Sequence, residues 1–590
     1  YDNDGHENSI SEVMLSDAWT EMLQNWLENY QELDAWCSYQ KEREQAQNMG
    51  LSAVVSAIDH GLQAEEIFPA FYKGWAGTYV KRTIEKEPQL QYFSGLAYEQ
   101  IIEKYRRLCE DFQEMSRQEI RARLLERLPN RMDGSDLKDF SILQKAIMGA
   151  GSKLTTRQLF SKMPGAVQML APCMLMSPAS VAQFIDPDFP KFDLVIMDEA
   201  SQLPTCEAVG AIARGKSVVI AGDEQQMPPT NFFKKKSAGE DIEMDDLESI
   251  LDDALALNMP QCYLSWHYRS AHESLITFSN THYYDSELRT FPSVDASSSA
   301  VQFINVGGIY DRAGTRTNEA EAKAVVDEIE RRIMAGKSQS IGVMTLNIQQ
   351  RGLINDCLQG RMDQNPAFHE AVIGMNPSLF IKNLENIQGD ERDVIILSLG
   401  YGPDEEGNMS MNFGPVNQEG GHRRLNVAVT RARQEMLVYA SFDPSAMRTT
   451  ERSARGLRDL KAFLEYAKQG AEILKCQESA AAKEKERINR EIAEKLREKG
   501  WNAEINIGTG KFRIDVAVRH PKIPEKYCLG IMFDDDASAL QDTVRDRNLL
   551  QKDVLQRMGW KILNLWLLDW YEDSTTQIQR IEDALKEIEG

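Results

Sequence analysis

Five short apolar runs, spread between about residue 165 and residue 445, constrain the fold more than any other feature of the chain. They are "DLVIMDEA", "KSVVIAGDE", "SIGVMTLN", "DVIILSLG" and "EMLVYAS", and helical stretches separate them. Runs of about four to six β-branched or apolar residues, without alternation, are typical of strands that are buried on both faces of a parallel sheet. The pattern therefore predicts an α/β architecture.

Two adjacent carboxylates end the first run. In "DLVIMDEASQ" the apolar residues are followed by Asp198 and Glu199, and ligands of open parallel sheets bind at the carboxyl ends of the strands. One carboxylate can hold Mg2+ while the other orients or deprotonates a water molecule, as in a phosphate-cleaving ATPase. Taken alone, such a pair more often only caps the next helix.

A second loop, "GDEQQMPPT", follows the apolar run "SVVIA" and extends from Gly222 to Thr230. Gly222 and Asp223 end the predicted strand, and the prolines restrict the path of the loop after it. Such a loop can place Gln226 beside the γ-phosphate of a nucleotide. Two motifs of this kind in succession are much less expected by chance than one.

Three later segments add basic and polar candidates. They are "LSWHYRS", "NIQGDERDVIILS" and "RRLNVAVTRAR". Arginines that approach from a separate lobe can neutralise the charge that develops on a transferred phosphoryl group; the alternative is that they form ordinary surface salt bridges. The candidate residues in these segments are Arg269, Gln388, Gly389, Glu391, Arg431 and Arg433.

The order of these motifs resembles motifs II to VI of superfamily 1 helicases. DEASQ, GDxxQxPPT, a YR pair, QGxE before an apolar strand and LNVAxTRAR occur in the family's order between about residues 165 and 445. The similarity is strongest to the branch that includes the nonsense-decay and Okazaki-processing helicases. It implies two RecA-like P-loop NTPase domains, ATP and Mg2+ as cofactors, and a single-stranded nucleic acid, expected to be DNA, as partner, with translocation from 5' to 3'.

The resemblance also implies roles for individual residues. Asp198 would bind Mg2+, Glu199 would act as the base for water, and Gln226 would sense the γ-phosphate. Arg269 and Arg431 would act as arginine fingers. Glu391 would hold the ribose, and Gly222, Asp223, Gln388, Gly389 and Arg433 would complete the nucleotide site. His267 and Ser270 replace residues that are common in the family, and they receive no role.

One family motif is missing from these 590 residues. A Walker-A loop, GxxxxGK[ST], provides backbone amides and a lysine for the β- and γ-phosphates, and "GAGSKLTT" lacks its adjacent Gly-Lys pair. We therefore expect the loop upstream of Tyr1, so that the first RecA-like domain is incomplete. On its own, this fragment is expected to bind ATP poorly and to be inactive.

The motifs divide the chain into four expected regions. Residues 1–150 form a helical insertion, with tryptophans such as Trp19 and Trp26 in its core. Residues 151–260 form the C-terminal part of the first RecA-like domain, and residues 261–470 form the second. Residues 471–590 contain a helical linker and a small restriction-endonuclease-like α/β domain.

This last domain resembles the nucleases of very-short-patch repair. The similarity depends on "FRIDVAV", "YCLGIMFDD" and "RDRNLLQKDVLQRMGWKILNLWLLDW". Asp515 matches the first metal-binding carboxylate, but Met532 stands where relatives have Glu, and a thioether cannot replace a hard oxygen ligand of Mg2+. Asp534 is the only obvious replacement. We expect a vestigial nuclease; the alternative is that the domain still cleaves DNA.

Contacts to nucleic acid are expected after the second motif, where "FFKKK" combines aromatic rings with cations that suit a single strand. The candidates are Thr230, Phe232, Lys234 and Lys235. A plain solvated loop is the alternative, since the acidic "EDIEMDD" follows and would repel phosphate.

The net charge of -24 argues against broad phosphate binding but does not exclude a local basic groove. No apolar stretch is long enough to cross a membrane, and the eight cysteines contain no CxxC pair, which favours a reducing cytoplasm. A second hypothesis is a non-enzymatic scaffold with a degenerate helicase core. Such a protein would not need Glu199, Gln226 and Arg431, so the helicase hypothesis is favoured.

Overall fold

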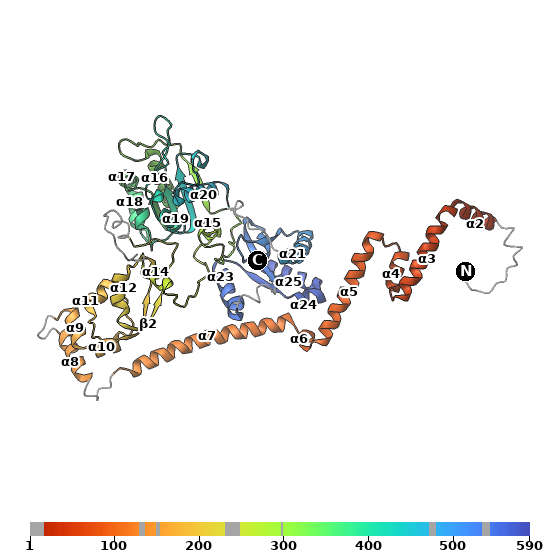
Figure 1. Ribbon diagram of the computed structural model, residues 1–590, viewed down its shortest axis with the longest axis horizontal. Coiled ribbons are helices and arrows are strands. Elements are labelled where there is room, and N and C mark those ends of the chain that lie inside the picture. The colour runs from red at the N-terminus through yellow and green to blue at the C-terminus, as the bar shows by residue number, and fades with distance from the viewer. Residues whose placement is uncertain are drawn as a thin grey trace. The chain divides into compact units, whose positions relative to one another are not determined.

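The computed structural model describes residues 17–128, 136–148, 154–229, 248–296, 299–470, 480–533 and 543–589 (Figure 1). It separates into two compact units, Tyr1–Tyr98 and Glu99–Gly590. Each unit is described by itself.

The first unit is helical throughout its described part. It contains α2 (Asp17–Glu28), a 3-10 turn (Tyr30–Glu32), α3 (Leu33–Asn48), α4 (Ser52–Asp59), α5 (Ala64–Lys86) and α6 (Pro88–Gln91), and α7 (Gly95–Glu126) begins at its end. A capping box starts α5, in which the side chains of Gln63 and Glu66 bond reciprocally to the backbone.

The expectation that the tryptophans of this unit are buried is wrong. Trp26, Trp36 and Trp75 are 62%, 57% and 53% exposed. The described helices of this unit pack mainly against their neighbours along the chain, so no second layer covers their aromatic side chains. On α5 the rings of Phe68, Tyr72, Trp75 and Tyr79 contact one another in series, with centroids 6.2, 5.8 and 5.7 Å apart.

Helices also begin the second unit. α7 has ion pairs one turn apart, such as Glu103 with Arg107 and Glu119 with Arg123, as expected of a solvated helix. α8 (Asp136–Ile147), α9 (Thr156–Lys162), α10 (Pro164–Leu170) and α11 (Pro178–Phe184) follow. They surround a small core that includes Met163, Ile185 and Phe189.

Two parallel strands form the first sheet. β1 (Phe192–Met197) pairs with β2 (Gly215–Ile220), with Met197 opposite Ile220; α12 (Thr205–Ile212) connects them and α14 (Ile250–Ala256) packs nearby. Both strands therefore end at the same edge, where Ala221 N donates to the Met197 carbonyl at 2.8 Å.

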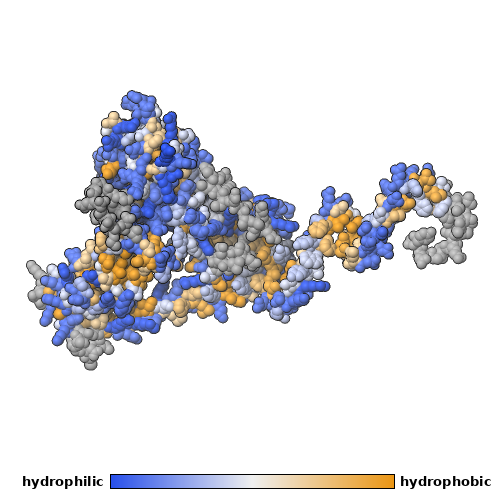
Figure 2. Space-filling view, viewed as in Figure 1, coloured by the Kyte–Doolittle hydropathy of each residue, from blue (hydrophilic) through white to orange (hydrophobic). Residues whose placement is uncertain are grey.

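This sheet leaves much apolar surface exposed. Leu194, Ile196 and Val219 are 48%, 63% and 47% exposed, and Figure 2 shows apolar side chains gathered over α12 and α14. Parallel sheets are normally covered on both faces. Among the described residues, this two-stranded sheet is therefore covered less than is usual for a parallel sheet.

The second sheet has five parallel strands in the order β3-β7-β6-β4-β5. Their bounds are Val301–Asn305 (β3), Ile341–Thr345 (β4), Phe380–Asn383 (β5), Arg392–Ser398 (β6) and Ala432–Ala440 (β7). The side chains of Val394, Ile395, Ile396 and Leu397 on β6 are completely buried. The predicted parallel sheet is thus confirmed here.

Helices cover both faces of this sheet (Figure 1). Alternate residues such as Ile395 and Leu397 share a core with α15 (Ser274–Tyr283), α19 (Gly421–Val429) and α20 (Arg455–Gln469). Val394 and Ile396 share another with α16 (Glu319–Met334), α17 (Ile348–Gln364) and α18 (Pro366–Ile373). The result is a three-layer α/β domain.

The third sheet has the strand order β11-β10-β9-β8. β8 (Ala503–Ile507), β9 (Ile514–His520) and β10 (Ile523–Phe533) are antiparallel, while β11 (Ile562–Leu565) is parallel to β10. Its helices are α21 (Ala480–Glu498), a π-helical turn (Asp546–Leu550) that leads into α23 (Gln551–Arg557), α24 (Leu567–Glu572) and α25 (Ser574–Glu589). In the segment "WKILNLWLLDW", β11 is followed directly by the helix α24.

The close packing of α19 against α20 provides a test of the fold. A Cβ on Gly456 would lie 2.3 Å from the Val416 carbonyl oxygen, so Gly456→Ala must displace backbone. We expect a loss of about 1–3 kcal/mol in stability, measured by denaturant or thermal unfolding. In the control Gly352→Ala, on α17, the Cβ meets open space, and a gain of up to about 1 kcal/mol is expected. Equal stabilities of the two variants would contradict this packing.

Candidate functional site

The turn after β1 presents the two predicted carboxylates. Glu199 has a φ of 52°, in the left-handed region, which is costly for a residue with a side chain and is common at functional sites. The Asp198 carboxylate accepts a hydrogen bond from Glu199 N at 2.9 Å, which stabilises this turn. Both side chains are exposed at the carboxyl edge of the sheet.

The loop after β2 lies beside this turn. A Cβ on Gly222 would lie 3.0 Å from Ser201 N and Leu251 Cδ2, so glycine is required by close approach of the two segments. Asp223 organises the loop, since its carboxylate accepts from Gln225 N at 2.9 Å and from Gln226 Nε2 at 3.0 Å. The loop therefore holds Gln226 near the end of the strand.

Gln388 joins these loops to the second sheet. Its Nε2 donates to Glu199 Oε2 at 3.2 Å and to Gln226 Oε1 at 3.3 Å. The residue lies in the loop before β6, and Gly389 beside it has a φ of 86°, which favours glycine. Three residues predicted from separate motifs thus lie in direct contact, in a site formed by both RecA-like domains.

Two residues without a predicted role make a second connection. The Tyr284 hydroxyl donates to Asp223 Oδ2 at 2.8 Å, and Asn426 Nδ2 donates to that hydroxyl at 2.9 Å and to the Gln225 carbonyl at 2.9 Å. Burial raises the pKa of Tyr284, so its hydroxyl remains a donor. Asn426 lies in the quoted motif "LNVAVTRAR"; Tyr284, in "THYYDSEL", has no such signal.

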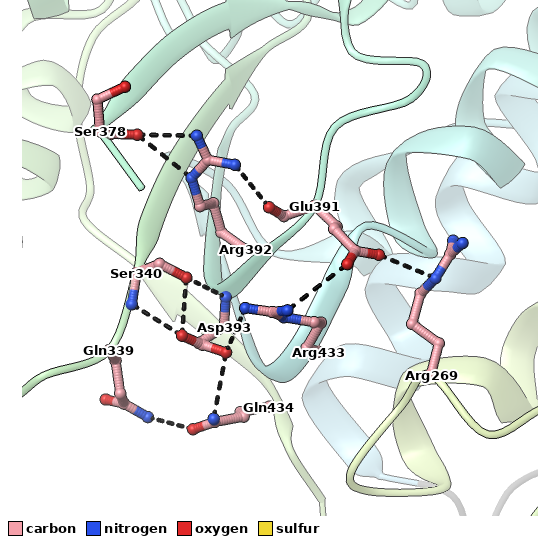
Figure 3. A network of polar contacts seen from close by, with 9 residues as sticks. All are labelled: Arg269, Gln339, Ser340, Ser378, Glu391, Arg392, Asp393, Arg433 and Gln434. Atoms are coloured by element: carbon pink, nitrogen blue, oxygen red, sulfur yellow. Dashed lines mark hydrogen bonds and ion pairs between the residues drawn. The ribbon is translucent and has the colours of Figure 1, made fainter. Parts of the chain in front are cut away.

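Arg269, Arg433 and Glu391 form an ion-pair network (Figure 3). Arg269 Nε lies 3.0 Å from Glu391 Oε2, and Arg433 Nη1 lies 3.5 Å from Glu391 Oε1. Arg433 also pairs with Asp393 at 3.0 Å, and its carbonyl accepts from Ala271 N at 2.7 Å. Arg269 and Arg433 are thus in salt bridges with Glu391, which follows Gln388 by three residues.

Arg431 is buried next to this network. Its Nε donates to the Val427 carbonyl at 2.7 Å, and its Nη2 donates to Thr430 Oγ1 at 3.1 Å. Burial lowers its pKa, as does the nearby Arg269, while the charges of Glu199 and Glu391 raise it. Arg431 therefore places a positive charge between the carboxylates of the two domains.

His267 shapes the turn that contains Arg269. Its Nε2 accepts a hydrogen bond from Ser270 N at 3.3 Å and lies 2.8 Å from Ser270 Oγ. Burial, and then the charge of Arg269, lowers the pKa of His267 to about 4. The ring is therefore neutral near pH 7 and can accept this bond.

The carboxylates of Asp198 and Glu199 are suitable ligands for an Mg2+ ion that is also bound by a nucleotide. Within the described residues no group of three or more His, Cys, Asp or Glu side chains could enclose a metal ion. Mg2+ in nucleotide sites is typically bound by one or two carboxylates, with phosphate oxygens and water as the other ligands. The exposed Asp198, with Glu199 beside it, suits that arrangement.

Five predicted residues cannot be placed in this site. Thr230, Phe232, Lys234, Lys235 and Asp534 lie outside the described residues. Asp515 belongs to the third sheet, where its buried carboxylate accepts from Phe533 N at 2.8 Å and lies 3.5 Å from Asn489 Nδ2. Met532, on the adjacent strand β10, is partly buried.

Family models match three parts of the chain. Two models described as AAA domain match residues 176–234 and 247–443, which include both RecA-like sheets. A third, REase_MTES_1575, matches residues 489–585.

Curated relatives are named as helicases. "Uncharacterized ATP-dependent helicase MG140" of Mycoplasma genitalium is 28% identical over 454 residues, which are 72% of this chain and 40% of that protein. "ATP-dependent helicase upf1" of Schizosaccharomyces pombe is 27% identical over 42% of this chain and 27% of its own. "5'-3' DNA helicase ZGRF1" of mouse is 27% identical over 43% of this chain and 13% of its own.

The two AAA-domain matches and the relatives named as helicases support a superfamily 1 helicase core. A nuclease-like domain follows the helicase core at the C-terminus. The chain spans about 40% of the length of the Mycoplasma relative. Among the described residues of the helicase core and its flanking domains, no helix is both long and apolar enough to cross a membrane.

The pKa of His267 predicts a pH effect on the stability of the helicase core. Below pH 6.5 His267 binds a proton in the unfolded chain, whereas in the folded chain it binds one only below about pH 4. Stability is therefore lost as the pH falls through this window, by about 3 kcal/mol in total. His267→Gln should remove this part of the pH dependence, as measured by unfolding between pH 7 and pH 4. Parallel profiles for the variant and the natural chain would disprove the assignment.

Proposed function

We propose that this helicase core belongs to an ATP-dependent translocase that moves on single-stranded DNA from 5' to 3'. The observation that supports it most is the contact of Gln388 with both Glu199 and Gln226. It connects the two RecA-like domains at the residues that would meet the γ-phosphate and the attacking water. Motion of one domain relative to the other would therefore be coupled to hydrolysis at this point.

The residues of the site can divide the chemistry of phosphoryl transfer among them. Glu199 would orient and deprotonate the water, with its carboxylate held by Gln202 Nε2 at 3.0 Å as well as by Gln388. Gln226 would contact the γ-phosphate. Mg2+, held by Asp198, would neutralise phosphate charge when bound.

The arginines of this network could exchange their carboxylate partner for a phosphate group of the nucleotide. Glu391 here neutralises Arg269, an exposed ion pair of the kind that is worth only about 0–1 kcal/mol. The exchange of this carboxylate for a phosphate group would therefore cost little free energy. Arg269 would then face the transferred phosphoryl group beside Arg431. Glu391 would be released toward the ribose, which is its expected role.

The exposed apolar side chains of β1 and β2 are evidence that the first RecA-like domain has a further part. We infer that a segment outside these 590 residues covers Leu194, Ile196 and Val219 and contains the phosphate-binding loop. The sequence in hand lacks GxxxxGK[ST], and the curated relative is considerably longer than this chain. Both facts agree with this inference.

Relatives support DNA as the substrate. One is named "5'-3' DNA helicase ZGRF1" and another "DNA polymerase alpha-associated DNA helicase A". The predicted contacts of Thr230, Phe232, Lys234 and Lys235 with the single strand stay a prediction, as do the four domain boundaries. A cytoplasmic location is proposed on the cysteine pattern alone.

The nuclease-like domain is proposed to be inactive. Both oxygens of the Asp515 carboxylate face protein donors, and Met532 lies near it on the neighbouring strand. Oxygen ligands are needed to bind Mg2+. Cleavage of DNA that requires Mg2+ and is lost in Asp515→Ala would refute this proposal.

The variant Glu199→Gln, in the full-length protein, tests whether Glu199 is the base that deprotonates the attacking water. The amide keeps the size of the side chain but cannot accept a proton from water, so ATP hydrolysis should fall by at least about 100-fold. ATP binding, measured by equilibrium titration of a fluorescent analogue, should change little. The matched control is Glu207→Gln on α12, a first-turn acidic residue outside the site, for which we expect normal turnover.

Unchanged hydrolysis in Glu199→Gln would exclude Glu199 as the base. The 590-residue chain alone should show no hydrolysis stimulated by single-stranded DNA. If it does, the inferred upstream phosphate loop is wrong.

A further inference from the structure

A segment of the helicase core extends the sheet of the nuclease-like domain. Residues 294–296 run along β10: Tyr527 N donates to the Val294 carbonyl at 2.8 Å, and Ala296 N donates to the Glu525 carbonyl at 2.8 Å. Asp295 and Lys526 form an antiparallel bridge between these bonds. The two domains are therefore joined by backbone pairing, not by a tether alone.

Aromatic side chains from both domains share one core at this junction. The Trp266 and Phe291 rings have centroids 5.4 Å apart, and Phe291 lies 5.1 Å from Phe512 of the nuclease-like domain. Trp560 is buried, and its Nε1 donates to the Pro292 carbonyl at 2.7 Å. Burial of such rings stabilises the junction.

A buried carboxyl group lies across the same junction. Glu273 Oε2 accepts from Thr509 N at 2.8 Å, and its Oε1 accepts from Thr290 Oγ1 at 2.5 Å. A Cβ on Gly510 would lie 2.4 Å from Thr290 Oγ1, so the nuclease-like domain approaches this group as closely as glycine permits. Burying a carboxyl group is costly unless it is hydrogen-bonded, and here one bond comes from each domain.

The junction also contacts the turn that contains Arg269. His267 N donates to the Arg289 carbonyl at 2.9 Å, and Arg289 N donates to the Ser265 carbonyl at 2.7 Å. Residues 289–296 thus contact the arginine turn at one end and the nuclease-like domain along the rest. Glu273 follows the turn by four residues and begins α15 as its N-cap.

We propose that the nuclease-like domain positions the arginine finger of the ATPase site, with Glu273 as the positioning residue. The domain holds residues 289–296 and Glu273, and these hold the turn at Arg269, whose side chain pairs with Glu391. This proposal rests on the proposed ATPase function. In this role the nuclease-like domain needs its fold and its junction surface, but it needs no metal ligands.

The test measures kcat and KM for ATP in the full-length protein with single-stranded DNA. Glu273→Ala should lower kcat about 10-fold, because small displacements of a positioned group cost that much or more, and should change KM less than about 2-fold. Glu273→Gln should stay within about 2-fold of the natural protein, since its amide can accept from Thr509 N and donate to Thr290 Oγ1. Lys499→Ala is the control within the nuclease-like domain; it removes a surface pair with Glu582 and should leave kcat unchanged.

A double-mutant cycle separates positioning from general loosening. If Glu273 acts through Arg269, Glu273→Ala should cause no further loss of kcat in an Arg269→Ala background. An equal loss in both backgrounds, or no loss in the natural background, would overturn the proposal. Should Glu273→Ala fail to fold, Trp560→Phe, which removes the bond to the Pro292 carbonyl and part of the buried ring, replaces it in the same cycle with the same expected outcomes.

The cycle also distinguishes the two proposals. A large loss in Arg269→Ala with no effect of either junction variant leaves the ATPase proposal standing and overturns the positioning role. Full turnover in Arg269→Ala would refute the role of Arg269 as an arginine finger. It would also refute the positioning role of Glu273.

Discussion

The side-chain amide of Gln388 lies where two parallel sheets meet, and the site depends on that contact. A primary amide can donate two hydrogen bonds, and here Nε2 reaches Glu199 and Gln226 from a loop of the other domain. Parallel strands end at one edge, so the loops after β1 and β2 converge without any specific pairing of side chains. Gln388, Tyr284 and Asn426 then connect this edge to the second domain.

A second constraint acts on the arginine side of the site. Arg269 lies in a turn whose shape depends on neutral His267, on pairing with Arg289, and on a junction core that includes Phe291 and Trp560. The nuclease-like domain contributes most of that core. A domain whose Asp515 is held by protein donors can still be retained for the geometry that it imposes on its neighbour.

Much of this arrangement could be predicted from single motifs. Runs such as "DVIILS" predicted buried parallel strands because only residues buried on both faces can be apolar without alternation, and β6 confirms it. Asp198, Glu199, Gln226, Gln388 and Arg269 could be chosen as candidates because their motifs occur in the order of those of superfamily 1 helicases. Tyr284 and Glu273 were missed because no local pattern distinguishes a tyrosine or a buried glutamate that bonds to a distant segment. The tryptophans of the helical unit were misplaced because helical spacing predicts an apolar face but not whether a second layer covers it.

The sequence by itself determined the α/β class, the order of the helicase-like motifs, the absence of GxxxxGK[ST] from these 590 residues and the presence of Met532 where a Glu ligand was expected. These follow from residue type and local spacing, which need no knowledge of distant contacts. Only the tertiary structure decided that Gln388 bridges two domains, that Glu391 pairs with Arg269 and Arg433, and that Glu273 bonds across the junction to Thr509. Those contacts join residues far apart in the chain, and chain folding alone brings their atoms within hydrogen-bonding distance.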